Sequence, residues 1–212
     1  MKYIEETVLE VKHYTDSLFT FRTTRSRSFR FEAGQFVMLG LYSEKYNRDI
    51  FRAYSIVSTP YDEYLEFISI KVPDGPLTSI LQNIKPNDKI KIQQKTTGSL
   101  LIDYVYPKEN LVLLATGTGI APFMSIVQDY KTYEKFKNVY LFHTVRTISE
   151  LAYKTKFIRL ENDLPVTYID SVTEEPYIRQ GRFWNHITNT LGTDLYKARD
   201  SIMVCGSRDL NL

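Results

Sequence analysis

The pattern of hydrophobic and polar positions changes rhythm about halfway along the chain. In the first half, apolar residues alternate with polar ones, as in half-buried strands, and turn-forming residues such as Thr15-Asp16-Ser17 separate the runs. The pattern predicts strands over residues 8–14, 18–22, 35–41, 54–57, 65–71 and 89–93. Closely spaced strands of this kind predict an antiparallel barrel or sandwich. One short helix, Leu77–Leu81, is predicted among them, after the turn Pro73-Asp74-Gly75-Pro76.

The second half alternates strands with helices. Residues 111–115 form a continuous apolar run, as expected for a strand buried on both faces of a parallel sheet. Further strands are predicted over residues 139–143, 166–169 and 202–205, and helices over 121–130, 149–160 and 183–191. This order is typical of an open α/β sheet with right-handed crossovers. We therefore expect two domains, residues 1–104 and 108–212, with a boundary near residues 103–110.

Composition and charge exclude several classes of function. The net charge of +2 is too small to indicate nucleic acid, although a local basic patch remains compatible with it. One cysteine, Cys205, and three scattered histidines indicate neither a disulfide framework nor a metal site. No apolar run approaches the ~20 residues that span a bilayer, and the N-terminus lacks the apolar core of a secretory signal. A cytoplasmic protein without a membrane partner is expected.

Three motifs carry candidate chemistry. Arg52-Ala53-Tyr54-Ser55 offers a phosphate-binding fork, a ring to stack on and a hydroxyl, although an ordinary strand fits the same four residues. The turn at Gly75 precedes a helix start that favours an anion, and a capped turn is the simpler interpretation. The turn Gly117-Thr118-Gly119 follows a buried strand and opens a helix, which favours nucleotide binding. A generic turn stays open there, because the third glycine of the usual fingerprint is missing.

A fourth motif, Cys205-Gly206-Ser207, ends the last predicted strand. Ligands of parallel sheets bind beyond the carboxyl ends of the strands, so this is a suitable place for a site. A lone cysteine on a strand is more often a buried small hydrophobe. In this order, the four motifs resemble the ferredoxin–NADP reductase superfamily, and the segments 71–79 and 95–100 are similar to its bacterial subclass.

The resemblance covers essentially the whole chain and implies a fold and an activity. It implies an antiparallel FAD-binding β-barrel followed by an open parallel-sheet domain that binds NAD(P). The activity would be hydride transfer between NADP(H) and flavin N5, with single electrons passing between the flavin and ferredoxin or flavodoxin. Members of the bacterial subclass are often monomers, which is the expectation here.

The resemblance also implies roles for individual residues. Arg52 would pair with the FAD pyrophosphate, Tyr54 would stack on the isoalloxazine, and Ser55 would lie near flavin N5. Cys205 would lie close to the nicotinamide ring, which makes the expected catalytic residues Ser55, Tyr54 and Cys205. The other expected FAD contacts are Ala53, Pro76, Leu77, Thr78 and Thr118. The other expected NADP contacts are Gly117, Gly119, Arg146, Thr173, Arg182 and Gly206.

Two departures from the family pattern create specific expectations. Glu174 stands where an arginine for the adenosine 2′-phosphate belongs, and a carboxylate there would repel the phosphate unless Arg179 rotated in to compensate. NADPH is expected as the substrate, with weakened discrimination against NADH. The sequence also stops at Asp209–Leu212, where relatives continue through a helix, a strand and a tail. A C-terminally truncated chain with an unprotected sheet edge is expected.

Two other functions stay open, together with one hypothesis about docking. The chain also fits a general NAD(P)H–flavin reductase or oxygenase reductase component, or a truncated fragment that binds flavin without catalysis. An added iron–sulfur domain is excluded by the single cysteine. Basic residues crowd the segment 20–31, namely Arg22, Arg25, Arg27 and Arg30. A solvated hairpin is the simpler interpretation, and the hypothesis is that this segment steers an acidic electron acceptor.

Overall fold

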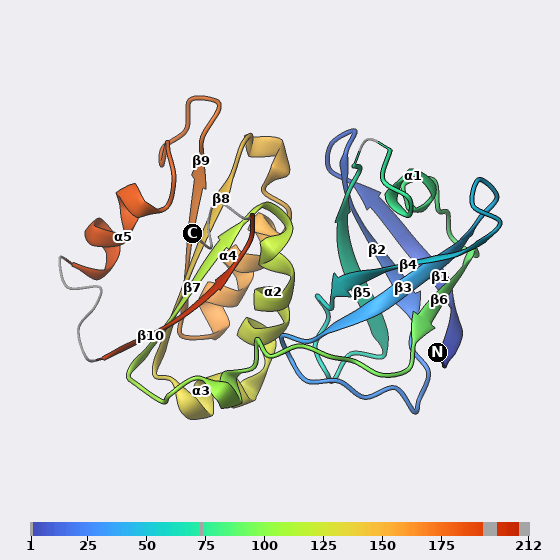
Figure 1. The fold of residues 1–212 in the computed structure, drawn as a ribbon. Helices are drawn as coiled ribbons and strands as arrows, with labels where there is room; N and C mark the ends of the chain where they lie inside the picture. Colours follow the sequence, from blue (N-terminus) through green and yellow to red (C-terminus); the bar gives the residue numbers. More distant parts are fainter. Residues whose placement is uncertain (1, 73, 193–198, 208–212) are drawn as a thin grey trace. The chain divides into compact units, whose positions relative to one another are not determined.

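Two units make up the chain, Met1–Leu101 and Ile102–Leu212, and each is described by itself. The computed structural model describes residues 2–72, 74–192 and 199–207 (Figure 1). Residues 102–104, next to the predicted boundary near residues 103–110, form the short 3-10 turn η1 (Ile102–Tyr104), which belongs to unit 2. Pro73 of the predicted turn and the final residues Asp209–Leu212 lie outside the described residues.

Unit 1 is a six-stranded antiparallel sheet in the order β4-β3-β6-β1-β2-β5. The sheet curls until its two edge strands meet, where the Tyr54 hydroxyl lies 3.1 Å from Ser69 Oγ. This confirms the predicted antiparallel barrel as a curled, barrel-like sheet. Its elements are β1 (Tyr3–His13), β2 (Leu18–Thr24), β3 (Phe36–Ser43), β4 (Arg48–Ser55), β5 (Tyr64–Ile70), α1 (Thr78–Leu81) and β6 (Lys89–Gln93).

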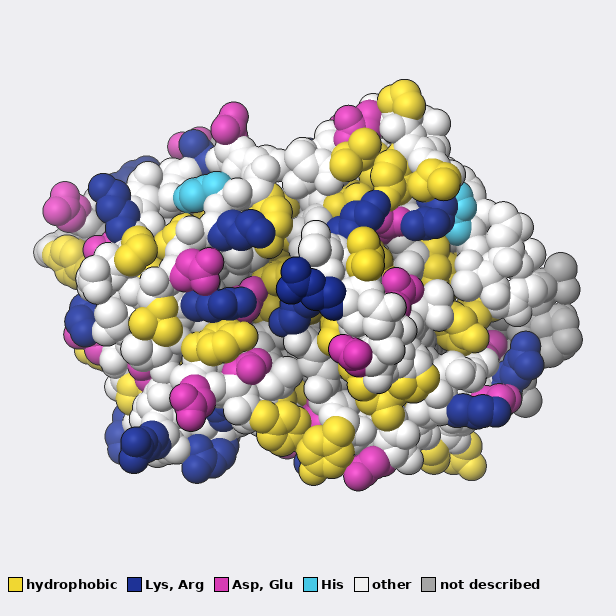
Figure 2. All heavy atoms as spheres, turned by 180° about the vertical axis from the view of Figure 1, so that it is seen from behind, with side chains coloured by type: hydrophobic (Ala, Val, Ile, Leu, Met, Phe, Trp, Pro, Cys, Tyr) yellow, Lys and Arg dark blue, Asp and Glu magenta, His cyan; other side chains and the backbone are white. Residues whose placement is uncertain are grey.

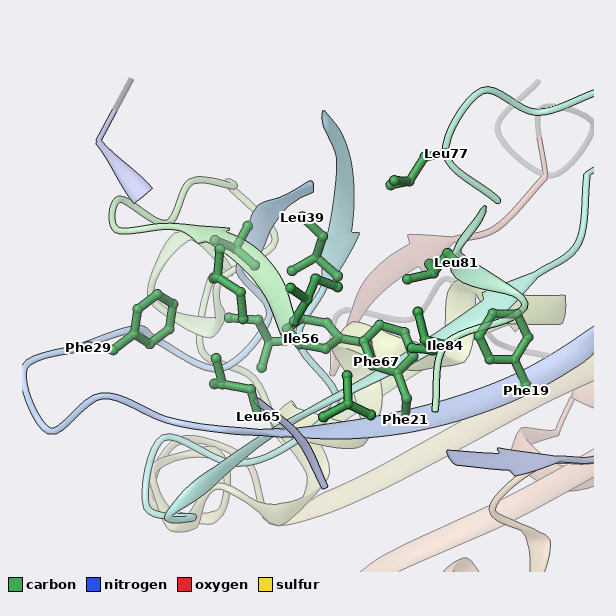
Figure 3. Packing of buried hydrophobic residues seen from close by; sticks show 14 of the residues in the cluster. Phe19, Phe21, Phe29, Leu39, Ile56, Leu65, Phe67, Leu77, Leu81 and Ile84 are labelled. Carbon is green, nitrogen blue, oxygen red and sulfur yellow. The ribbon is translucent and has the colours of Figure 1, made fainter. Parts of the chain in front are cut away.

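Aromatic residues at alternate positions build the core of unit 1. Phe19 and Phe21 of β2 are both buried, because residues two apart point to the same face of a strand. Phe21 is paired with Phe67 of β5, and their ring centroids are 5.3 Å apart. Leu77 and Leu81, at the start and end of α1, join the same cluster (Figure 3). Burial of these two leucines therefore holds the short helix against the curled sheet.

Strand β4 differs from its prediction. Its observed span is Arg48–Ser55, whereas residues 54–57 were predicted. The polar residues Arg48, Asp49 and Arg52 obscured the strand pattern over residues 48–53. These residues nevertheless pair in continuous register with β3, from Phe36↔Ser55 to Ser43↔Arg48. Asn47 closes this hairpin at φ 49°, a conformation that asparagine tolerates.

Unit 2 is a parallel four-stranded sheet in the order β10-β7-β8-β9, as the alternation of strands and helices predicts. Its strands are β7 (Asn110–Thr116), β8 (Asn138–Val145), β9 (Val166–Val172) and β10 (Asp200–Cys205). Its helical segments are η1, η2 (Gly117–Gly119), α2 (Ile120–Gln128), α3 (Tyr130–Lys135), η3 (Ile148–Glu150), α4 (Lys154–Asp163) and α5 (Trp184–Leu191).

Helices α4 and α5 cover opposite faces of this sheet. Phe157 of α4 stacks on Tyr168 of β9 with ring centroids 4.2 Å apart. Ile187 of α5 packs in a cluster with Ile169, the next residue of β9. Successive side chains of a strand point to opposite faces, so the two helices lie on different sides. This is the layering of an open α/β sheet.

Two predicted helices are interrupted. The helix predicted over residues 121–130 ends at Gln128, and Asp129 caps a new helix, α3, by accepting a hydrogen bond from the Lys131 amide at 3.0 Å. The helix predicted over residues 149–160 begins as η3 and resumes as α4 after Tyr153, which has φ 66°. In both cases a local feature, the Asp129 cap or the backbone angle of Tyr153, interrupts a helix that the apolar periodicity alone predicts as continuous.

The surface carries large apolar side chains among charged ones. Tyr104 and Tyr106 are 72% and 77% exposed. Figure 2 shows hydrophobic side chains interspersed with Lys, Arg, Asp and Glu. Among the helices of the described residues, none combines the length and the apolar character needed to cross a bilayer.

Candidate functional site

Strand β4 presents an exposed cation, Arg52. Its Nη1 donates to the carbonyl of Phe51 at 2.8 Å. Within the described part of the chain, Arg52 forms no ion pair. Ala53, beside it, is also exposed and adds no bulk. The guanidinium is therefore available to a phosphate group, the anion that its planar fork fits best.

Tyr54 and Ser55 place a fixed ring next to a hydroxyl. The Tyr54 ring packs against the barrel core, and burial raises the pKa of its phenol, which stays neutral at physiological pH. Ser55, the last residue of β4, is half-buried, and its hydroxyl has no hydrogen-bond partner among residues 2–72, 74–192 and 199–207. A flat ring ligand would find an aromatic surface and a hydroxyl donor on this strand.

The turn before α1 is held together by Thr78. Its Oγ1 accepts from the Val72 amide and donates to the Val72 carbonyl, both at 3.3 Å. A Cβ at Gly75 would lie 2.2 Å from this hydroxyl, so a larger residue would displace the Thr78 side chain. The amide of Thr78 makes no hydrogen bond within the described residues, while Leu77 is buried. The hydroxyl of Thr78, an expected FAD contact, thus stabilises the turn in which it lies. The Thr78 amide is available as a donor to an anion beside Pro76.

The glycine turn and the C-G-S segment lie together at the carboxyl ends of two adjacent parallel strands. Strand β10 pairs with β7 up to Cys205↔Ala115, and the Ser207 amide then donates to Thr116 Oγ1 at 2.9 Å. A Cβ at Gly119 would lie 2.2 Å from the Cys205 carbonyl oxygen and 2.8 Å from Gly206 Cα. The structure therefore brings these two predicted motifs into direct contact, in the place where open α/β sheets bind ligands.

Within that cluster, the protonation state of Cys205 and the backbone conformation of Gly117 are defined. Burial raises the pKa of the Cys205 thiol, so it is neutral at physiological pH and is not primed as a nucleophile. Gly117 has φ +50°, and a Cβ added there would meet nothing within 4 Å. Thr118, which follows it, is half-buried in the same turn.

Three other expected NADP contacts, Arg146, Thr173 and Arg182, are also brought together, next to Glu174. The Thr173 amide donates to the Val145 carbonyl at 3.1 Å, and the Glu174 amide donates to the Arg146 carbonyl at 2.9 Å. Arg182 follows Gly181, whose amide donates to the carbonyl of Val172, the last residue of β9, at 2.8 Å. These segments therefore lie side by side where β8 and β9 end.

The positive charge of this cluster is offset by more negative charge than the family pattern implies. Arg146 Nη2 lies 2.7 Å from Glu150 Oε1, and this hydrogen bond raises the pKa of the arginine, with a smaller contribution from Glu174. Arg182 is exposed and makes no ion pair within the described residues. Two carboxylates thus accompany two arginines.

Arg179, which the sequence left open as a cation that could compensate for Glu174, is paired with Asp170. Its Nε donates to the Asp170 carbonyl at 2.7 Å, and its Nη2 contacts the Asp170 carboxylate. Asp170 is buried in β9 and also binds Lys154 Nζ at 2.9 Å and the Tyr177 hydroxyl at 2.6 Å. Arg179 is therefore committed to a structural cluster.

Sequence reasoning missed His143 and Asp170. Both are buried, and they are paired neighbours on β8 and β9. His143 Nε2 lies 2.9 Å from the Gly117 carbonyl oxygen, which connects this strand to the glycine turn. The available signal was a histidine and an aspartate inside otherwise apolar strands, because buried polar side chains need partners.

The basic segment of unit 1 is largely used for structure. Arg25 Nη1 donates to the carbonyls of Pro60 and Asp62 at 2.9 and 2.7 Å, and Nη2 donates to the Phe29 carbonyl at 3.0 Å. Arg22 pairs with the buried Glu66 at 2.9 Å. Arg27 and Arg30 are exposed, so they are the two arginines of the segment that fit a steering role.

Models of two protein families match the chain in the order of its two units. The oxidoreductase FAD-binding domain matches residues 7–98, and the oxidoreductase NAD-binding domain matches residues 113–211. The first match contains the β4 motif and α1. The second contains the glycine turn and the C-G-S segment.

Individual relatives are similar over most of the chain. It is 48% identical over 186 residues to a ferredoxin–NADP reductase of Pseudomonas aeruginosa, covering 84% of this chain and 71% of that protein. Ferredoxin–NADP reductase A of Sorangium cellulosum is 44% identical, with coverage of 98% and 80%. A solved ferredoxin NADP+ reductase from Neisseria gonorrhoeae with bound FAD and NADP matches with a TM-score of 0.91 and 32% identity, covering 99% of this chain and 87% of that one.

Proposed function

This chain belongs to the ferredoxin–NADP reductase family, and on that premise we propose that it moves electrons between NADP(H) and ferredoxin or flavodoxin with FAD as its cofactor. The observation that carries the proposal is the contact of Gly119 with Cys205 and Gly206, which assembles a nucleotide-binding edge from two distant motifs. The enzyme would act as a monomer in the cytoplasm.

The residues of unit 1 fit FAD. Arg52, which has no carboxylate partner among the described residues, would pair with the pyrophosphate, and the Thr78 amide beside Pro76 would add a neutral donor. The Tyr54 ring would stack on the isoalloxazine, and Ser55 would offer its hydroxyl at the flavin edge. The bound flavin would supply the chemistry, since it accepts hydride and releases electrons singly.

The residues of unit 2 fit a nicotinamide nucleotide. Gly117 and Gly119 would let the backbone approach the pyrophosphate, and the neutral Cys205 thiol would border the nicotinamide without reacting. Arg146, Thr173 and Arg182 would surround the 2′-phosphate. The two carboxylates nearby would lower the advantage of NADPH over NADH.

The test is an anaerobic absorbance spectrum of the FAD-loaded protein before and after NADPH is added. Bleaching of the flavin bands, followed by their return when ferredoxin or flavodoxin is added, is the expected result. Flavin that stays oxidised would support a fragment that binds FAD without catalysis. A protein that takes up no FAD would contradict the proposal.

Replacing Glu174 with arginine is expected to increase the preference for NADPH over NADH by about 10-fold, the effect of one additional charge-assisted contact to a phosphate. Glu174 is exposed and hydrogen-bonded to Arg146 only through its backbone, so the change leaves the turn intact. The measurement is kcat/KM for both nucleotides. Glu134→Arg, an equal change of charge on α3, is the control, and an equal shift there would contradict the role of position 174.

Replacing both Arg27 and Arg30 with glutamate is expected to slow reduction of the protein acceptor by about 10-fold at low salt, because attraction between opposite charges speeds association. The difference should shrink as salt screens the charges. Stopped-flow rates at several ionic strengths measure it, with flavin reduction by NADPH unchanged. The control is Lys45→Glu with Arg48→Glu, at the β3–β4 hairpin. An equal loss in the control would show that only net charge matters.

A further inference from the structure

A buried histidine, His143, is hydrogen-bonded to the glycine turn. His143 lies on β8, is 1% exposed, and its Nε2 is 2.9 Å from the Gly117 carbonyl oxygen. Its Nδ1 lies 3.0 Å from the hydroxyl of Tyr168 on β9. Three neighbouring elements, the turn, β8 and β9, are thus connected through one imidazole ring.

The hydrogen-bond partners determine which nitrogen carries the proton. A carbonyl oxygen only accepts, so Nε2 must donate to Gly117, and a neutral ring then accepts the Tyr168 hydroxyl proton at Nδ1. Burial lowers the pKa of His143 to about 4, and the opposing effects of the Gly117 carbonyl, Asp170 and Glu150 are smaller. The ring is therefore neutral, in one tautomer, across the physiological range.

This contact fixes the direction of the amide that follows. The Gly117 carbonyl also accepts from the Ile120 amide, so two donors hold its oxygen. The described chain has no cis peptide bond, and in a planar trans peptide the carbonyl and the N–H point in opposite directions. Because the oxygen points to His143, the Thr118 N–H points away from it. That amide has no hydrogen-bond partner among the described residues.

We propose that His143 is a positioning residue for NADP(H), which holds the Gly117–Thr118 peptide with its N–H presented to a phosphate oxygen of the nucleotide. The inference rests on the proposed function. His143 itself is buried, so it would act through the Gly117–Thr118 peptide and not through direct contact with the nucleotide. Without the histidine, the Ile120 amide would be the remaining described donor to this oxygen, and glycine at φ +50° adds no side-chain obstacle to rotation of the peptide.

Two substitutions of His143 by residues with amide side chains distinguish loss of the hydrogen bond to Gly117 from the general effect of losing the imidazole ring. His143→Gln places an amide nitrogen near the position of Nε2 and keeps a donor for Gly117. His143→Asn is shorter, reaches only the position of Nδ1, and leaves the Gly117 carbonyl without its side-chain donor. We expect the asparagine variant to bind NADP+ about 10-fold more weakly and the glutamine variant to stay within about threefold of the wild type.

The first measurement is calorimetric titration of the FAD-loaded proteins with NADP+, and the second is KM and kcat with NADPH. KM should rise in the asparagine variant while kcat changes little. The third is amide hydrogen exchange of residues 116–121 without nucleotide, which should speed up in the asparagine variant alone. If the asparagine variant fails to fold, Tyr168→Phe takes its place as the test. This change removes the hydrogen-bond partner of His143 Nδ1 and should weaken NADP+ binding about two- to threefold.

If the asparagine and glutamine variants bind NADP+ equally well, whether as tightly as the wild type or equally more weakly, the inference is overturned and His143 is a packing residue. Wild-type protein that takes up FAD but does not bind NADP+ would instead overturn the proposed function. A glutamine variant that restores both affinity and exchange protection would support a positioning role, since a purely structural loss is not rescued by one donor.

Discussion

Gly119→Ala is expected to slow flavin reduction by NADPH about 100-fold and to lower the free energy of unfolding by about 3 kcal/mol. The added methyl would lie 2.2 Å from the Cys205 carbonyl oxygen, which is backbone and cannot rotate aside. Either the turn or the end of β10 must move, and both border the proposed nucleotide site. Stopped-flow flavin reduction and thermal unfolding measure the two effects.

Gly117→Ala is the matched control, because the two glycines are required for opposite reasons. Gly119 has an ordinary φ of −61° but no space for a side chain. Gly117 has space but a φ of +50°, which costs an alanine about 1 kcal/mol. Its loss of stability should therefore be the smaller one. An alanine at position 119 that reacts as fast as the wild type would contradict the close packing of the two motifs.

Asp170→Asn is expected to lower the free energy of unfolding by about 2–4 kcal/mol at neutral pH. The Asp170 side chain is 1% exposed, and its single negative charge is shared by ion pairs with Lys154 and Arg179. Removing the charge from one partner of a buried pair leaves the others uncompensated. The two cations are 38% and 37% exposed, so solvent screening keeps the loss below that of a fully buried pair.

The difference between the wild type and Asp170→Asn should depend on pH. Burial alone would raise the pKa of Asp170, but hydrogen bonds from Tyr177, Lys154 and Arg179 outweigh it, and the pKa is lowered. A carboxyl whose pKa is lower in the folded state stabilises the protein above its unfolded pKa, and the benefit is lost as the pH falls through the folded pKa. The neighbouring His143 is neutral above about pH 4 and adds no charge at neutral pH.

Melting temperatures of both proteins between neutral and acidic pH provide the measurement, and the two curves should converge on the acidic side. Asp163→Asn, at the exposed end of α4, is the control and should change stability by less than about 0.5 kcal/mol. A constant difference at all pH values would show that the cluster acts through packing and not through charge.

The fold could be predicted wherever one face of an element is apolar and the other polar. Residues 89–93 were predicted as a strand and form β6, because Ile90 and Ile92 alternate with exposed or half-buried neighbours. Residues 48–53 of strand β4 were missed, because its polar residues are stabilised by pairing with the partner strand and not by burial. The breaks at Asp129 and Tyr153 depend on a cap and a backbone angle, which apolar periodicity does not report.

The candidate site could be predicted where it consists of local motifs and not where it consists of tertiary contacts. The sequence located Gly119 and Cys205 but not their contact, which depends on the pairing of β7 with β10. It left open that Arg179 could compensate for Glu174, because nothing in the segment around Arg179 reveals that its partner is the buried Asp170. His143 was missed for the same reason, since its role exists only through the neighbouring turn.

The surroundings of the glycine turn are completed later in synthesis than the strands of unit 1. The hydrogen bond from the Ser207 amide to Thr116 Oγ1 joins residues 91 positions apart. During synthesis on the ribosome, unit 1 has all its strands once residue 93 has emerged, and domains that emerge first generally fold first. The turn at Gly119 must wait for β10 before its surroundings are complete. A nascent chain should therefore become able to hold FAD well before it can bind the nucleotide that reduces it.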